Sequence, residues 1–231
     1  MLLLAGSLDC MKVRIRGVLF DMDGVLISSI GSVERSWTRW AESRGIDPKA
    51  AITMAHGRRA IETVRTLRPD LNDLEELKSL EDMEVADTDG VAALEGVLPI
   101  LEALPADRWA VVTSATERLA RSRLEHGGIP APAWLVTADR VTRGKPDPEP
   151  YLTGAQYLGL KPEECLVIED AASGAKAGHA AGCKVLATLF SHSLESLSAA
   201  DWVVDSLKDV RVTVDGDWIE CDFEPVRAVS R

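Results

Sequence analysis

Two aspartates, Asp21 and Asp23, follow the apolar residues 18–20 and precede Gly24. This pattern is typical of a buried strand that ends in a tight loop. Two carboxylates this close repel each other, so a cation or a bound proton is expected to compensate. An acidic turn after an edge strand is the alternative when the stretch is considered alone.

Polar residues follow other apolar runs of the chain in the same way. They are Thr113, Ser114, Glu169 and Asp170. One lysine, Lys145, lies in the loop before a further predicted helix. In a doubly wound sheet, the loops after successive strands meet at one edge. We therefore expect the carboxylates, the lysine and a hydroxyl to gather there.

Such a set of side chains suits phosphate chemistry. Carboxylate oxygens suit Mg²⁺, which binds through one or two carboxylates together with phosphate and water. A lysine and a hydroxyl suit phosphate oxygens. A carboxylate that faces phosphorus can attack it and form an aspartyl-phosphate, and a second carboxyl can protonate the leaving oxygen. Mg²⁺ and Lys145 would offset the repulsion between Asp21 and a phosphate dianion.

The elements that must position these residues alternate between strand and helix. Predicted strands cover residues 13–20, 109–113, 134–136, 165–168, 184–189 and 202–204, and predicted helices cover 94–104, 116–126, 148–158 and 171–181. This alternation predicts an α/β fold with a doubly wound parallel, Rossmann-like sheet. Alternating residues on both sides of an Asp-Gly turn predict a terminal β-hairpin over residues 210–223.

A helical block separates the first strand from the rest. From residue 28 to residue 93 apolar residues recur at helical spacing, and no strand alternation interrupts residues 48–93. We expect an inserted α-helical cap domain of residues 28–93 and an α/β catalytic core of residues 11–27 and 94–231. The tryptophans Trp37 and Trp40 are expected to pack inside the cap.

Charge, cysteine spacing and the lengths of the apolar runs limit the class of protein. The net charge of −11 argues against a nucleic-acid or anionic-membrane surface but allows a small anionic substrate. The cysteines lack the spacing of a disulfide framework or a zinc site. No run reaches transmembrane length, and the apolar start is too short for a signal peptide. Met11 is a plausible alternative start, and we expect a cytoplasmic monomer.

Four motifs of the chain resemble those of one known superfamily. They are D-M-D-G-V-L (residues 21–26), T-S (113–114), G-K-P-D-P-E-P-Y (144–151) and I-E-D-A-A-S-G (168–174). Their order and their places at strand ends resemble the haloacid dehalogenase-like superfamily of phosphotransferases. The helical block resembles that of its β-phosphoglucomutase-like branch, which carries a cap after the first strand.

The resemblance implies catalytic and metal-binding roles. Asp21 would be the nucleophile and a ligand of Mg²⁺. Asp23 would be the general acid and base and would give a backbone carbonyl to the metal. Asp170 would bind the metal directly, whereas Glu169 would lie behind it or bind through water. Dehalogenases of the superfamily lack a carboxylate two residues after the nucleophile, so Asp23 indicates phosphoryl transfer.

The resemblance also implies a phosphate-binding set. Ser114 and Lys145 would hold the phosphoryl group. Backbone N–H groups of Met22, Asp23 and Ala115 would assist them.

Two activities fit within the branch. A β-phosphoglucomutase-like enzyme carries a histidine where this chain has Val33 and an acidic residue where it has Ser28. Residues 55–64, 104–114 and 135–151 are instead similar to phosphatases of the glycerol-3-phosphatase and 2-deoxyglucose-6-phosphatase type. We therefore expect a phosphatase for a small sugar phosphate or polyol phosphate.

Cap residues are the candidates for substrate contacts. Arg59 is the first candidate and His56 the second, near Gly57 and Arg58, with Glu81 as a weaker one. A solvated basic helix start is the alternative for this stretch. A non-enzymatic phospho-ligand-binding protein on the same fold is a further alternative, which the intact motif residues disfavour.

Overall fold

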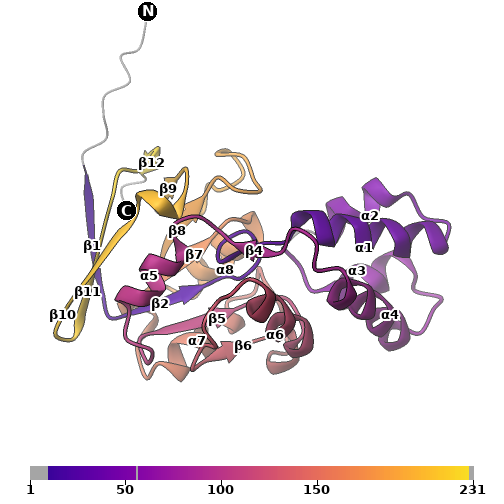
Figure 1. Ribbon diagram of the computed structural model, residues 1–231, viewed down its shortest axis with the longest axis horizontal. Helices are drawn as coiled ribbons and strands as arrows, with labels where there is room; N and C mark the ends of the chain where they lie inside the picture. Colours follow the sequence, from indigo (N-terminus) through magenta and orange to yellow (C-terminus); the bar gives the residue numbers. More distant parts are fainter. Residues whose placement is uncertain (1–9, 56, 229–231) are drawn as a thin grey trace, which may run out of the picture.

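The computed structural model describes residues 10–55 and 57–228, and Figure 1 shows them as an α/β part with a group of helices at one end. The helices are α1 (Ile30–Ser43), α2 (Pro48–Ala55), α3 (Ala60–Leu67), α4 (Asp73–Ala86), α5 (Val97–Ala103), α6 (Glu117–His126), α7 (Glu149–Tyr157) and α8 (Ala172–Ala180). The strands are β1 (Met11–Ile15), β2 (Gly17–Phe20), β3 (Ile27–Ser28), β4 (Ala92–Ala93), β5 (Trp109–Val112), β6 (Leu135–Val136), β7 (Cys165–Glu169), β8 (Lys184–Thr188), β9 (Trp202–Val204), β10 (Arg211–Asp215), β11 (Trp218–Phe223) and β12 (Arg227–Ala228).

Within the described residues, the main sheet has seven strands in the order β12-β9-β8-β7-β2-β5-β6. All neighbours are parallel except β12, which runs antiparallel to β9. In the centre, Phe20 of β2 pairs with Val111 of β5 and with Ile168 of β7. These three strands therefore end at nearly the same level. The predicted doubly wound α/β fold is confirmed.

Helices cover both faces of the sheet because side chains of a strand alternate between faces. On one face Val18 and Phe20 of β2 belong to an apolar cluster that includes residues of α5 and α6. On the other face Leu19 belongs to a second cluster with residues of α7 and α8, among them Tyr151 and Ala175. The buried strands are thus packed on both sides, as parallel sheets require.

The expected opening strand is in fact two strands. β1 lies outside the main sheet and is separated from β2 by Arg16. It pairs antiparallel with β11, which also pairs with β10. The three form a small separate sheet that includes the predicted terminal hairpin. Val13 and Ile15 are buried between this sheet and the core, so their alternation with polar residues is that of a one-sided antiparallel strand.

Helices α1 to α4 form the group at one end of the molecule (Figure 1) and have their own apolar cluster. Trp37 and Trp40 lie in it edge to face, with ring centroids 5.4 Å apart. The chain enters and leaves this group side by side, because β3 pairs antiparallel with β4. The helix expected from residue 94 begins only at Val97, after Gly96 with φ +87°. The assignment of residues 28–93 as a cap domain stays a proposal.

Two further expectations concern the cysteines and the membrane. The thiols of Cys165, Cys183 and Cys221 are buried and Cys10 is exposed, and no disulfide joins any of them in the described part of the chain. In the parts of the chain that the structure describes, no helix is both long and apolar enough to cross a membrane.

Candidate active site

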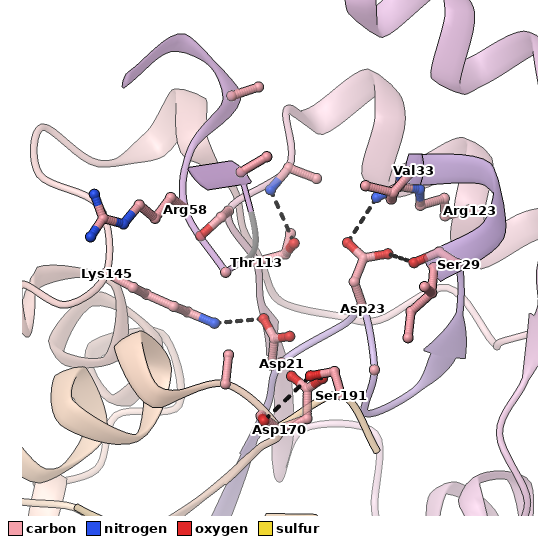
Figure 2. A pocket seen from close by; sticks show the side chains of 18 of the residues that line it. Asp21, Asp23, Ser29, Val33, Arg58, Thr113, Arg123, Lys145, Asp170 and Ser191 are labelled. Carbon is pink, nitrogen blue, oxygen red and sulfur yellow. Dashed lines mark hydrogen bonds and ion pairs between the residues drawn. The ribbon is translucent and has the colours of Figure 1, made fainter. Parts of the chain in front are cut away.

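The ends of β2, β5 and β7 bring the predicted polar residues to one cavity. Its volume is about 130 Å³, and it lies between the carboxyl edge of the sheet and helices of the end group. Asp21 and Asp23 line it from the loop after β2, and Asp170 lines it from the loop after β7. Figure 2 shows Lys145 and Arg123 on opposite sides of the two aspartates.

Lys145 is buried and uses its ammonium group fully. Its Nζ donates to Asp21 Oδ1 at 2.5 Å, to Glu169 Oε1 at 2.7 Å and to the carbonyl oxygen of Val112 at 3.0 Å. Burial alone would lower the pKa of Lys145, but the charges of Asp21 and Glu169 outweigh it and raise that pKa. The lysine is therefore held protonated beside Asp21.

Glu169 has no exposed edge and is fixed from several sides. The Tyr151 hydroxyl donates to its Oε1 at 2.6 Å. The backbone N–H groups of Asp170 and Ala171 donate to its Oε2 at 3.1 and 3.2 Å. It also lies against α8, where a Cβ at Gly174 would come within 1.6 Å of Oε1. Glu169 thus anchors Lys145 from behind.

Asp21, Glu169 and Asp170 have the composition of a hard-cation site. Each offers an oxygen, and these oxygens lie within 4.8 Å of one another. Burial, opposed by Lys145, raises the pKa of Asp21 well above its usual value. Burial, together with the charge of Glu169, raises the pKa of Asp170 to about 7. A cluster of buried carboxylates short of positive charge fits Mg²⁺, which takes oxygen ligands.

Close approach of the β2 loop to Asp170 requires a glycine. Gly24 has φ +85°, and a Cβ there would lie 1.9 Å from Asp170 Oδ2. The Ser191 hydroxyl donates a hydrogen bond to that same Oδ2 (Figure 2). The orientation of Asp170 is therefore set by the loop after β8 as well as by its own strand.

Asp23 is held by two residues that the sequence did not indicate. The Ser29 hydroxyl donates to Asp23 Oδ1 at 2.6 Å, and Arg123 Nη1 donates to Oδ2 at 2.8 Å (Figure 2). Arg123 Nη2 in turn donates to Glu84 Oε1 at 3.1 Å. Burial, opposed by Arg123, raises the pKa of Glu84.

The predicted phosphate-binding residues that follow β5 lie at the same cavity. Thr113, Ser114 and Ala115 line it after β5. The N–H of Ala115 donates to Thr113 Oγ1 at 3.1 Å, which fixes the turn of this loop. Met22 has a fully buried side chain, and its carbonyl oxygen accepts hydrogen bonds from the N–H groups of Val25, Leu26 and Ile27.

The cap candidates do not all face this cavity. His56 lies outside the described residues. Arg58 lines the cavity, whereas Arg59 donates from Nε to Glu62 at 2.7 Å and from Nη1 to the carbonyl of Val141 at 3.3 Å. Arg59 lines a second cavity of about 290 Å³, which shares Ser114 and Ala115 with the first.

Glu81, the weaker cap candidate, lines that second cavity too. It accepts hydrogen bonds from Thr116 and from Arg118 Nη1, the latter at 2.8 Å. Its contacts therefore join α4 to the start of α6.

A weak signal for Arg123 was present in the sequence. In α6 the buried positions are Leu119, Ala120, Arg123 and Leu124, at the three- and four-residue spacing of a core-facing stripe. A charged residue inside such a stripe needs a partner. The partners could not be read from the sequence, because Asp23 and Glu84 lie 100 and 39 positions away.

Comparison with known proteins gives a consistent result. A family model described as haloacid dehalogenase-like hydrolase matches residues 15–182. Hexitol phosphatase A of Escherichia coli (strain K12) is 41% identical over 206 residues, covering 87% of this chain and 95% of that protein. Glycerol-1-phosphate phosphohydrolase 2 of Saccharomyces cerevisiae is 33% identical over 217 residues, covering 87% and 86%.

Solved structures support the fold. The crystal structure of β-phosphoglucomutase from Clostridium difficile superposes with a TM-score of 0.74 at 23% identity. The match covers 85% of this chain and 93% of that one. At this identity the likeness bears on the fold alone.

Proposed function

The chain belongs to the haloacid dehalogenase-like hydrolases, and from this premise we propose that it is a Mg²⁺-dependent phosphatase for a small sugar phosphate or polyol phosphate. The observation that carries the proposal is the contact of Lys145 with both Asp21 and Glu169 at the cavity that Asp23 and Asp170 also line. The carboxylate of Asp21 is held beside the buried cation Lys145, and the carboxylate of Asp23 lies at the wall of the same cavity.

In the first step Asp21 attacks phosphorus. A carboxylate oxygen of Asp21 forms a bond to phosphorus as the bond from phosphorus to the ester oxygen breaks. The protonated Asp23 carboxyl gives its proton to that oxygen, so the product leaves as a neutral alcohol. The hydroxyl and N–H groups after β5 bind the phosphoryl oxygens, and Lys145, whose three N–H groups already have acceptors, contributes its positive charge beside them.

In the second step water replaces Asp21. The Asp23 carboxylate takes a proton from a water molecule, whose oxygen attacks the aspartyl-phosphate and releases inorganic phosphate. Asp21 is thereby regenerated as a carboxylate and Asp23 as an acid. Mg²⁺ held by Asp21, Asp170 and the backbone carbonyl of Asp23, with Glu169 behind them, would supply positive charge that offsets the repulsion between carboxylate and phosphate.

The substrate class is proposed from the relatives and from the cavity. Hexitol phosphatase A and glycerol-1-phosphate phosphohydrolase 2 are named for polyol phosphates. The cavity is small, and Val33, Trp37 and Arg58 line it from the end group of helices. We propose that this group acts as the cap over a small substrate, with Arg59 and His56 as candidate contacts.

A β-phosphoglucomutase-like activity is the second candidate, favoured only by the fold. Val33 lines the cavity where the mutase-like enzymes carry a histidine. An apolar side chain there cannot take or give a proton, which favours water as the acceptor. A cytoplasmic location and a monomeric state stay predictions.

The test is a panel of sugar and polyol phosphates incubated with Mg²⁺ and followed by phosphate release. We expect release from at least one hexitol or glycerol phosphate, its loss in excess chelator, and its loss in Asp21→Asn. The variant should also fail to retain phosphate on the protein after rapid acid quenching. Asp107→Asn, at an exposed position, is the matched control and should behave as the wild type.

Two outcomes would contradict the proposal. Full turnover by Asp21→Asn, or in excess chelator, would exclude the aspartyl-phosphate route with Mg²⁺. Conversion of β-glucose 1-phosphate to glucose 6-phosphate in the presence of a bisphosphate primer, without net phosphate release, would favour the mutase.

A further inference from the structure

Arg123 is a buried cation that the phosphate chemistry above does not use. It lies in α6 with 5% of its surface exposed, and it lines the cavity beside Asp23. Its terminal nitrogens contact Asp23 and Glu84 at 2.8 and 3.1 Å. Its Nε is buried with no hydrogen-bond partner in the described part of the chain. Because burying an arginine with an unpaired Nε contributes little to stability, Arg123 is a candidate for a role at the site.

The charges around Arg123 argue against a role as a phosphate clamp. Two carboxylates, Asp23 and Glu84, already compensate its single positive charge. Lys145 lies on the opposite side of the aspartates, next to Asp21 (Figure 2). Arg123 is thus placed for Asp23, the residue that must move a proton.

The contacts of Asp23 define the plane of its carboxyl group. Ser29 donates to one oxygen and Arg123 to the other. Each carboxylate oxygen can accept at two positions, so one position on each oxygen remains for a proton or a substrate. A carboxyl group held at both oxygens cannot rotate freely, and the remaining positions keep a fixed direction.

We propose that Arg123 is a positioning residue for Asp23 and that Glu84 makes this positioning depend on the docked cap. The proposal rests on the proposed phosphatase function. Arg123 belongs to the α/β part and Glu84 to α4 of the end group, so the ion pair crosses the boundary between the two.

Further contacts along the same boundary support the dependence on the cap. Glu81 of α4 accepts from Thr116 and Arg118, and Asp82 accepts from Arg118 Nη1 at 2.5 Å. α4 therefore contacts α6 at two places. Partly exposed contacts of Glu81 and Asp82 join it to the start of α6, and the buried Arg123–Glu84 pair joins it to the middle of α6. When α4 lies in this position, Arg123 has Glu84 on one side and is held against Asp23 on the other.

The test uses two phosphate esters that differ in their need for a proton. Sorbitol 6-phosphate releases an alkoxide that must be protonated, whereas p-nitrophenyl phosphate releases a stabilised phenolate that needs no proton. Loss of a positioned general acid should therefore slow the first step far more with the first ester than with the second. Single-turnover release of the alcohol or phenol reports this step, whereas the second step, which uses Asp23 as a base, is common to both esters. A purely structural defect would slow both alike.

We expect Arg123→Gln to lower the single-turnover rate of alcohol release from sorbitol 6-phosphate by about 10²-fold and to change the rate of phenol release from p-nitrophenyl phosphate by less than about tenfold. Arg123→Lys, which keeps the charge but not the two-pronged geometry, should restore part of the loss. Glu84→Gln, which leaves Arg123 in place, should show the same preference for the phenyl ester to a smaller degree. Asp23→Asn serves as the reference for complete loss of the acid.

Arg121→Gln is the matched control, because Arg121 lies in the same helix but its ion pair is with Glu117 of α6 itself. Its rates on the two esters should keep the wild-type ratio. Thermal unfolding of every variant reports folding separately, and Glu84→Gln keeps the test valid if Arg123→Gln does not fold.

Equal loss of the first-step rate on both esters in Arg123→Gln and Glu84→Gln would overturn the role of Arg123 while leaving the phosphatase function intact. A wild-type protein that releases phosphate from no sugar or polyol phosphate of the panel would overturn the proposed function itself. A wild-type ratio in Arg123→Gln would likewise exclude the positioning role.

Discussion

At the scale of single residues, Lys145 is the buried cation beside the nucleophile candidate. It joins the nucleophile candidate Asp21 to Glu169 and to the end of β5. A buried ion pair gains little over an apolar replacement of both partners, but removal of one partner leaves an uncompensated charge. In this site two carboxylates would lose their cation at once.

Lys145→Met should therefore destabilise the protein as well as inactivate it. We expect the free energy of unfolding to fall by about 3–5 kcal/mol, because Asp21 and Glu169 stay buried without their partner. Denaturant unfolding followed by circular dichroism measures it. Lys176→Met, at an exposed position of α8, is the control and should leave stability nearly unchanged.

An unchanged free energy of unfolding of Lys145→Met would mean that Asp21 and Glu169 take up protons or water at little cost. The contacts of Lys145 with these carboxylates would then contribute little to stability.

The sequence predicted that five residues would meet at this site, and two kinds of signal identified them. Asp21, Asp23, Glu169 and Asp170 follow predicted strands directly, and Lys145 lies in a motif with a distinctive spacing. Their meeting follows from the topology of a parallel sheet. Their roles stay predictions until variants are measured.

At the scale of elements, α8 lies directly behind the site. Its first turn contains Gly174, where a Cβ would come within 1.6 Å of Glu169 Oε1 and 2.4 Å of Oε2. Because Glu169 is fixed by Tyr151 and by two backbone N–H groups, it has no unstrained place to go.

Gly174→Ala should therefore displace Glu169 and, through it, Lys145. We expect kcat to fall by about 10²-fold, the scale of a 1 Å misplacement of a reacting group. Gly31→Ala in α1 is the control: its closest neighbour is the flexible end of Arg35, so the change should be neutral or slightly stabilising. Wild-type turnover in Gly174→Ala would mean that α8 can shift without disturbing Lys145.

Elements were predictable where a single pattern decided them. Strands β5 to β9 and helices α6 to α8 lie within one or two residues of their predicted ends, since a buried apolar run and a closing glycine mark them. β1 was not separable from β2, because only Arg16 stands between Ile15 and Gly17. The pairing of β3 with β4 could not be foreseen, because two-residue strands have no periodicity.

At the scale of the whole molecule, a divalent cation should act on stability as well as on catalysis. Burial and Glu169 raise the pKa of Asp170 to about 7 in the metal-free protein, above its ordinary value of 3.8. Between these two values the folded chain holds the extra proton, and the unfolded chain does not. Stability of the metal-free protein from this group is therefore present at low pH and lost as pH rises toward 7.

Mg²⁺ should restore that loss, since it competes with the proton and binds the folded chain. We expect Mg²⁺ to raise Tm more at about pH 8 than at about pH 5, measured by thermal unfolding with Mg²⁺ or chelator. Asp170→Asn is the control and should show a smaller effect of Mg²⁺ at both values. A larger stabilisation at the lower pH would contradict this linkage.

The pairing of β1 with β11 places a constraint on the order of folding during synthesis. Ile15 of β1 can pair only after Ile219, its partner in the small sheet, has been synthesised. β2 can pair with β5 after about half of the chain has been made. At about 5–20 residues per second this wait is on the order of 10–40 s, long compared with helix or hairpin formation. During that time β1 is an unpaired strand edge, and its charged side chains Lys12 and Arg14 keep that edge from joining another chain.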